Sequence, residues 1–209
     1  MTIHYVVSPK GGSGKTHIAT LLAHLLPDPA VIEHASANDA APAFPEGARR
    51  TIRFTSDADR DLLTLEHAIS ILADHQNIVV NTPPSIGITV ISKHAQMLTP
   101  MGEQFGHESR VYVVVNDSTR WGADDVTAIL AGMGSRTHVV LNNCAGDKTI
   151  VEQLTDAIVE VDAQVHSIPR MSHRAIEDFL RERKPERPSL VTRVMGKRYV
   201  DACREALAS

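Results

Sequence analysis

A phosphate-binding loop is indicated near the start of the chain by the residue types and spacing of Ser8-Pro9-Lys10-Gly11-Gly12-Ser13-Gly14-Lys15-Thr16. Glycines let backbone N–H groups approach an anion closely, and the N-terminus of a following helix adds a favourable dipole. Lys15 is then placed to meet the β/γ-phosphates of a nucleotide, and Thr16 to give its hydroxyl to Mg²⁺. The candidate nucleotide-binding residues of this segment are Lys10, Gly11, Gly12, Ser13, Gly14, Lys15, Thr16 and His17.

A strand and a helix must position this loop. The apolar run before it predicts a strand over 3–8, and apolar residues at helical spacing after it predict a helix over 14–26 that ends at Pro27. Further along, short β-type runs alternate with helical patterns, which is typical of a parallel sheet with helices on both faces. Strands are expected near 3–8, 30–34, 51–54, 77–82, 110–116, 136–142 and 163–168, and helices over 14–26, 59–75, 86–97, 122–133, 148–160, 171–183 and 189–207.

Two stretches, 36–50 and 99–109, do not fit regular elements, and long loops in compact domains are usually functional. No internal repeat or linker divides the chain, so residues 1–209 are expected to form a single nucleotide-binding domain.

The string from Lys10 to Thr16 resembles the deviant Walker A motif of the ParA/MinD family, dimeric ATPases that partition plasmids and chromosomes or position division machinery. The resemblance implies a doubly wound, mostly parallel α/β sheet of P-loop NTPase type, with ATP and Mg²⁺ as cofactors. It also implies that Lys15 acts in cis and that Lys10 reaches the ATP of the partner in a homodimer, which makes both candidate catalytic residues. A dimer that depends on the third phosphate is a switch.

Weaker matches to the same family follow in order along the chain. A buried strand that ends in Asn81-Thr82-Pro83-Pro84-Ser85 resembles the family's Asp-x-Pro-Pro-Ser motif, so Thr16 and Asn81 are the candidate metal ligands. Asn142 ends a strand that resembles the one whose asparagine faces the adenine. The Ile-Pro-Arg turn with Pro169 and Arg170 resembles the turn that closes over the base.

Two departures from the family bear on hydrolysis. Members carry Asp-x-Asp-Pro-Gln after the second strand, and the second Asp orients the attacking water; here Glu33 takes the first position and Ala35 the second. Asp39 or Asn38 could fold back into that space, and Asp39 is the further candidate catalytic residue. Asn81 also lacks the charge of the aspartate it replaces. Both changes favour binding without efficient hydrolysis.

Composition agrees with an intracellular globular domain. The chain has 209 residues, 43% of them hydrophobic, which is enough for a full core. No apolar run approaches 18 residues and the chain starts on a strand, so we expect a cytoplasmic protein that does not bind membranes. The two cysteines lack CxxC spacing, and the eleven histidines lack metal-binding spacing; we expect these histidines at the surface or half-buried.

Positive charge gathers at the C-terminal end. Residues 1–169 contain 11 lysines and arginines against 19 aspartates and glutamates, whereas residues 170–209 contain 10 against 6. This region could bind DNA phosphates without sequence preference. Interleaved acidic residues leave a solvated helix face as the alternative.

Taken with the resemblance, these patterns predict an ATP-dependent dimerising switch for plasmid partition, stability or conjugal transfer, a slow ATPase that acts with a partner protein. One alternative is a nucleotide-gated scaffold that hydrolyses essentially nothing. A small-molecule ATP-dependent ligase on the same fold is disfavoured by Lys10.

Overall fold

A single parallel sheet organises the protein, which we describe from a computed structural model. The structure describes residues 1–8, 11–35, 40–55, 57–83, 107–116, 129–130, 137–142, 152, 156, 158–169, 176, 179–180 and 190–208. Its strands are β1 (Thr2–Val7), β2 (Pro29–His34), β3 (Arg49–Ile52), β4 (Asn77–Asn81), β5 (Glu108–Val115), β6 (Thr137–Asn142) and β7 (Gln164–Ile168). They pair in the order β3-β2-β4-β1-β5-β6-β7, and every pairing is parallel. The predicted α/β class is confirmed, as are all seven strands to within two residues.

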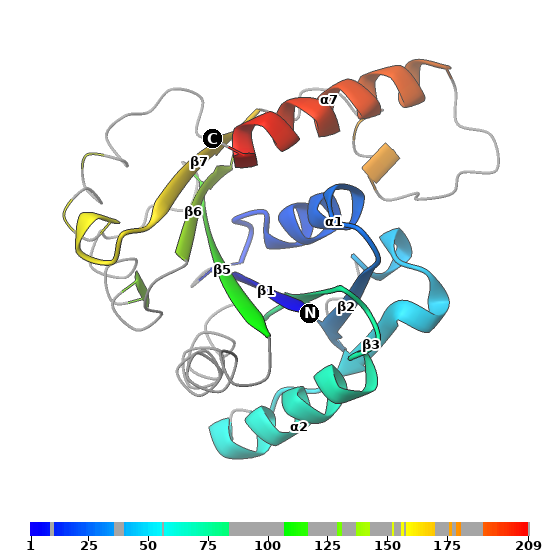
Figure 1. The fold of residues 1–209 in the computed structure, drawn as a ribbon, viewed down its shortest axis with the longest axis vertical. Coiled ribbons are helices and arrows are strands. Elements are labelled where there is room, and N and C mark those ends of the chain that lie inside the picture. The colour runs from blue at the N-terminus through cyan, green and yellow to red at the C-terminus, as the bar shows by residue number, and fades with distance from the viewer. Residues whose placement is uncertain are drawn as a thin grey trace.

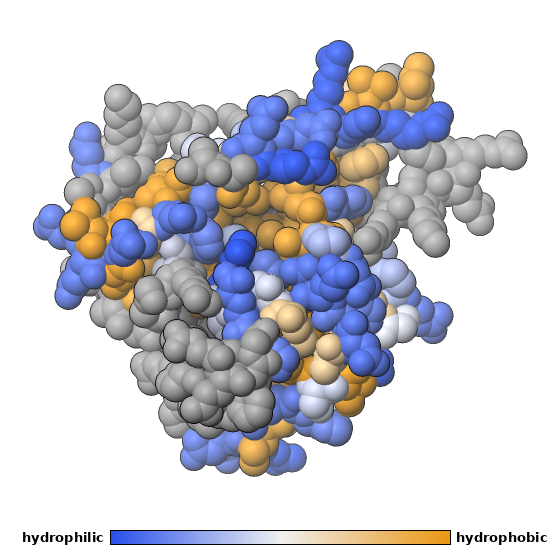
Figure 2. All heavy atoms as spheres, in the orientation of Figure 1, coloured by the Kyte–Doolittle hydropathy of each residue, from blue (hydrophilic) through white to orange (hydrophobic). Residues whose placement is uncertain are grey.

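Helices cover both faces of the sheet (Figure 1). On one face lie α1 (Lys15–Leu25) and α7 (Leu190–Ala208), and on the other lies α2 (Ala58–Ile71). No helix in the described part of the chain is long and apolar enough to cross a bilayer. Figure 2 shows hydrophobic surface at the amino-terminal end of α7, where Leu190 and Val194 are exposed.

Several predicted element bounds are corrected or fall outside the described residues. The helix expected over 59–75 ends at Ile71, because the chain turns there toward β4 and Leu72 N–H bonds back to Ile69 O. The stretch 36–50 is not wholly irregular: it holds the short 3₁₀ helices η1 (Ala41–Ala43) and η2 (Glu46–Ala48) and the start of β3. The expected helix 86–97 lies outside the described residues, and those over 122–133, 148–160 and 171–183 lie largely outside them.

Burial on both faces explains the sequence pattern of the strands. Ile3, Tyr5 and Val7 of β1 enter the core beneath α2, whereas Val6 enters the core beneath α1 and α7. A strand buried on both faces shows a continuous apolar run rather than an alternation. The apolar run of β1 was therefore a reliable predictor of a central strand.

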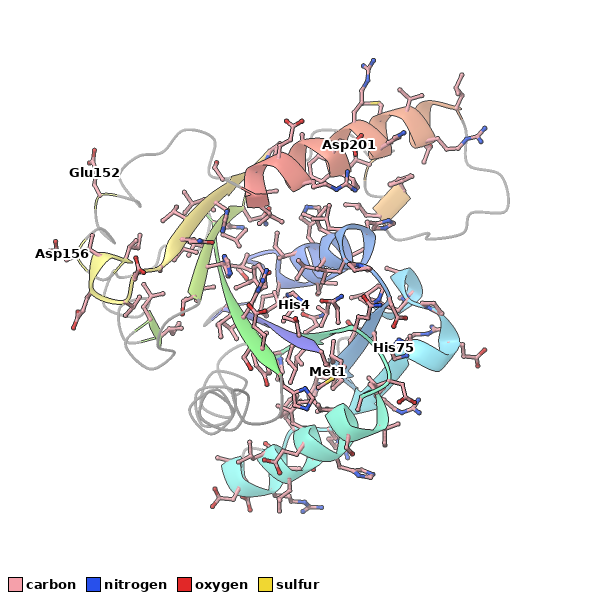
Figure 3. The ribbon with its side chains drawn as sticks, viewed as in Figure 1. Met1, His4, His75, Glu152, Asp156 and Asp201 are labelled. Carbon is pink, nitrogen blue, oxygen red and sulfur yellow. The ribbon has the colours of Figure 1, made fainter. Side chains whose placement is uncertain are left out.

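Polar side chains cross the face beneath α1 and α7 as a hydrogen-bonded row. His4 Nε2 donates to Asn77 Oδ1 at 3.0 Å and His4 Nδ1 accepts from the Tyr112 hydroxyl at 3.2 Å. Tyr112 stacks on His138, whose Nδ1 donates to His166 Nε2 at 2.9 Å. His4, labelled in Figure 3, and His166 are each only 1% exposed. The expectation of surface or half-buried histidines is wrong for these two, because partners on β4 and β5 satisfy both ring nitrogens of His4, and His138 of β6 and the Ala206 carbonyl of α7 satisfy those of His166.

Candidate nucleotide-binding site

The phosphate loop lies at the carboxyl end of the central strand β1 and leads directly into α1. Gly12 and Gly14 have φ of +80° and +95°, a backbone region that L side chains rarely adopt. Gly14 caps α1 without a side-chain hydrogen bond, and the first turn of α1 contains no acidic residue. The positive end of the helix dipole at this position therefore favours an anion.

Two asparagines from neighbouring strands hold the loop. Asn116, directly after β5, donates from Nδ2 to Gly12 O at 3.2 Å, and Asn142, at the end of β6, donates to Ser13 O at 3.0 Å. In a trans peptide the N–H points opposite to the C=O. Fixing the Gly12 and Ser13 carbonyls toward these amides therefore turns the N–H groups of Ser13 and Gly14 away from β5 and β6.

Lys15 is the first residue of α1, and it is only 8% exposed. Burial disfavours the ammonium and lowers the pKa of Lys15 from 10.5 to about 8. A phosphate beside this side chain would reverse that effect by favouring the charged form. The loop therefore has a buried lysine whose charged form a bound anion would favour.

A cluster of polar side chains lies next to the loop. Asn81, at the end of β4, directs Nδ2 to Glu33 Oε1 of β2 at 2.9 Å and lies 3.5 Å from Thr16 Oγ1. The opposite atom of this amide, Asn81 Oδ1, is buried with no hydrogen-bond partner in the described structure. Hydroxyl, amide and carboxylate oxygens suit Mg²⁺, which needs only one or two carboxylates when phosphates complete its shell. These residues therefore fit the implied Mg²⁺. Among the described residues no group of three or more His, Cys, Asp or Glu could hold a metal.

The structure brings most of the predicted site residues together. Gly11, Gly12, Ser13, Gly14, Lys15, Thr16, Asn81 and Asn142 lie around the carboxyl ends of β1, β4 and β6. Pro169 directly follows β7, at the same edge of the sheet. Lys10, Asp39 and Arg170 lie outside the described residues.

Two predicted side chains have partners that the sequence did not indicate. The Asn142 amide, expected to face an adenine, donates to the phosphate loop. His17 Nε2 bonds the Tyr199 hydroxyl of α7 at 2.7 Å, and burial lowers the pKa of His17 to about 4. Any contact of His17 with an anion would therefore use its backbone N–H.

Asn116 was missed as a candidate site residue, and Glu33, although aligned with the family's first aspartate, was given no role in the site. The available signal was position: each is a polar residue at or near the carboxyl end of a buried strand. Ligands bind at that edge of open α/β sheets, so polar residues there are candidates even without a motif.

Comparisons with solved structures agree with this fold. The nucleotide-binding protein of Archaeoglobus fulgidus, solved in complex with ADP and with Co, superposes with a TM-score of 0.55 at 12% identity, over 89% of this chain and 88% of that one. HypB from Helicobacter pylori in complex with nickel has a TM-score of 0.47 at 12% identity, over 97% and 88%. FtsY from Elizabethkingia anophelis has a TM-score of 0.48 at 16% identity, over 97% and 65%.

No protein-family model matches the chain, and no curated protein matches it in sequence. The last two TM-scores are too low to support an argument, and at 12% identity the first likeness extends to the fold alone. The chain has an α/β fold of the P-loop NTPase type, with its glycine loop at the carboxyl end of the central strand.

Proposed function

We propose that the protein is a nucleotide-dependent switch that binds Mg²⁺ and ATP at the phosphate loop. The observation that carries this proposal is the buried Lys15 ammonium at the start of α1, behind a loop that two strand-end asparagines hold in place. A bound anion at this position would be attracted both by the ammonium and by the positive end of the helix dipole. Mg²⁺, when bound, would offset charge on the β/γ-phosphates, and Thr16 and Asn81 are the residues that would hold it.

The finer proposal is a ParA-like homodimer that serves plasmid partition, stability or transfer with a partner protein in the cytoplasm. Its support is the leading lysine of the loop, Lys10, which would contact the ATP of the partner. Base contacts from Asn142, Pro169 and Arg170 belong to the same proposal. Adenine is the expected base.

Two lysine variants test both levels of this proposal. Lys15→Ala should weaken ATP binding at least about tenfold, or about 1.4 kcal/mol, because it removes the charge that offsets the phosphates. Lys10→Ala should retain ATP binding but lose ATP-dependent dimerisation. Calorimetry measures the first effect and light scattering the second.

Lys197→Ala, which removes an exposed lysine of α7, is the matched control for both measurements. Equal ATP affinity in Lys15→Ala and wild type would refute the site. A Lys10→Ala protein that dimerises normally with ATP would refute the trans role and, with it, the ParA-like assignment.

Slow ATP turnover is the expected behaviour of this site. Ala35 directly follows β2, and its methyl side chain cannot accept a hydrogen bond from the attacking water. Asn81 is neutral where the family has a carboxylate. We propose Asp39 as the residue that could orient the water, so Asp39→Ala should abolish whatever single-turnover rate the wild type has.

A nucleotide-gated scaffold with essentially no hydrolysis is the second candidate, and the neutral Asn81 beside Thr16 favours it. Single-turnover measurement separates the two functions. Release of phosphate from a stoichiometric ATP complex supports the switch, whereas an ATP complex that persists unhydrolysed for hours supports the scaffold.

A DNA contact is proposed for α7. Arg193, Lys197 and Arg198 are exposed on this helix, beside the exposed Leu190 and Val194. Cations on one exposed helix can contact phosphates without reading sequence. Asp201 and Glu205 on the same helix are the acidic residues that the alternative, a solvated face, would use.

A further inference from the structure

Among the described residues, the carboxyl group in hydrogen-bond contact with a predicted metal ligand belongs to Glu33 of β2. Glu33 and Asn81 are direct partners in the β2–β4 ladder, and they are 1% and 2% exposed. Glu33 Oε1 accepts from Asn81 Nδ2 at 2.9 Å and from Ala40 N–H at 3.0 Å. A carboxylate can only accept hydrogen bonds, so the Asn81 NH₂ must face Glu33, which leaves the unpartnered Oδ1 on the other side.

An ionised Glu33 would give this pair one negative charge across two adjacent strands. Were position 81 an aspartate, two buried carboxylates would face each other at hydrogen-bonding distance, and one of them would have to bind a proton. The asparagine avoids this conflict and still offers an oxygen. An asparagine at position 81 is thus compatible with a carboxylate at position 33, whereas an aspartate there would repel it.

We propose that Glu33 supplies the anionic charge of the Mg²⁺ site beside Thr16, and that Asn81 positions this charge. Asn81 Nδ2 donates to Glu33 Oε1 at 2.9 Å and to Thr16 Oγ1 at 3.5 Å, so its NH₂ group links the carboxyl group of Glu33 to the threonine hydroxyl. Mg²⁺ keeps several waters in protein sites, so the carboxylate can act through that water shell. The inference rests on the proposed function, since it needs a bound nucleotide.

Glu33 also anchors the segment that follows β2, through its bond to Ala40 N–H. A purely structural role would therefore explain its burial without any metal. Glu33→Gln separates the two roles, because glutamine keeps an oxygen for Ala40 but removes the charge. The swapped variant Glu33→Gln/Asn81→Asp returns one carboxylate and one amide to the same pair.

The experiment measures Mn²⁺ binding to the ADP complex by electron paramagnetic resonance. Glu33→Gln should weaken Mn²⁺ binding by about tenfold or more, because a hard cation loses its anionic partner. The swapped variant should recover an affinity within about threefold of wild type. Glu46→Gln, the same change at an exposed glutamate of η2, should leave the Mn²⁺ affinity unchanged.

ADP affinity in the presence of Mg²⁺ is measured first, with a thermal melt of every variant. A wild type that binds no ADP would refute the proposed function itself. Normal ADP binding with a Mn²⁺ affinity that Glu33→Gln leaves within about twofold of wild type would overturn the inference alone. If Glu33→Gln does not fold, the swapped variant decides: recovered Mn²⁺ binding supports the inference, and a loss of more than about tenfold overturns it.

Discussion

Nucleotide affinity should fall as the pH rises through the titration of Lys15. Burial lowers the pKa of this side chain to about 8 in the protein without nucleotide. A phosphate contact should raise it again, because an adjacent anion favours the ammonium. Binding is then coupled to proton uptake above pH 8, and affinity must decrease as the deprotonated fraction of the free protein grows.

The size of the effect follows from that pKa. With a bound-state pKa above about 10, the dissociation constant for ADP should rise about tenfold between about pH 7 and pH 9. Proton uptake on binding should be about half a proton at pH 8 and about nine-tenths at pH 9. Excess Mg²⁺ keeps the nucleotide phosphates ionised over this range.

Calorimetry in buffers of different ionisation enthalpy measures both quantities. Lys15→Met should bind weakly at every pH with no proton uptake, whereas Lys197→Met, at an exposed position, should keep the wild-type profile. An ADP dissociation constant that is the same at both pH values, with no proton uptake, would show that the Lys15 ammonium does not meet the phosphates. The reasoning for the whole site would then fail.

Three further perturbations test other parts of the structure. Gly14→Ala places a methyl group at φ +95° against a neighbouring asparagine amide, so it should lower the free energy of urea unfolding by about 1–2 kcal/mol and weaken ADP binding. The control is Gly47→Ala, whose added Cβ meets nothing within 4 Å and which should change neither quantity. Burial lowers the pKa of His4 and His138 to about 4, below the unfolded value of 6.5. The free energy of unfolding should therefore be highest above pH 6.5 and fall toward pH 4, with His4 alone accounting for a loss of about 2–3 kcal/mol at pH 4.5. A His4→Gln protein that loses as much stability as wild type over that range would contradict this. Binding to random duplex DNA with ATP present should weaken steeply between about 50 and 200 mM salt, and no binding even at low salt would favour a solvated α7.

The sequence by itself determined the elements and the phosphate loop. The central strands β1, β4 and β5 are buried on both faces and were visible as apolar runs, whereas the edge strands β3 and β7 are largely polar. The loop residues act through local backbone geometry between β1 and α1. Glycines at positive φ were the expected residues for Gly12 and Gly14 for the same local reason. A binding loop formed by residues that are adjacent in sequence can therefore be predicted from the sequence.

Only the tertiary structure decided which polar groups meet. Glu33 and Asn81 are 48 residues apart and become partners because β4 pairs with β2, while Asn116 reaches Gly12 across 104 residues. His4 could be buried because Asn77 and the Tyr112 hydroxyl form hydrogen bonds with its two ring nitrogens. These partners are distant in sequence, so no local sequence pattern predicts them. Strand order is set by long-range packing, so the charge of the site, unlike its loop, could not be read from residue spacing alone.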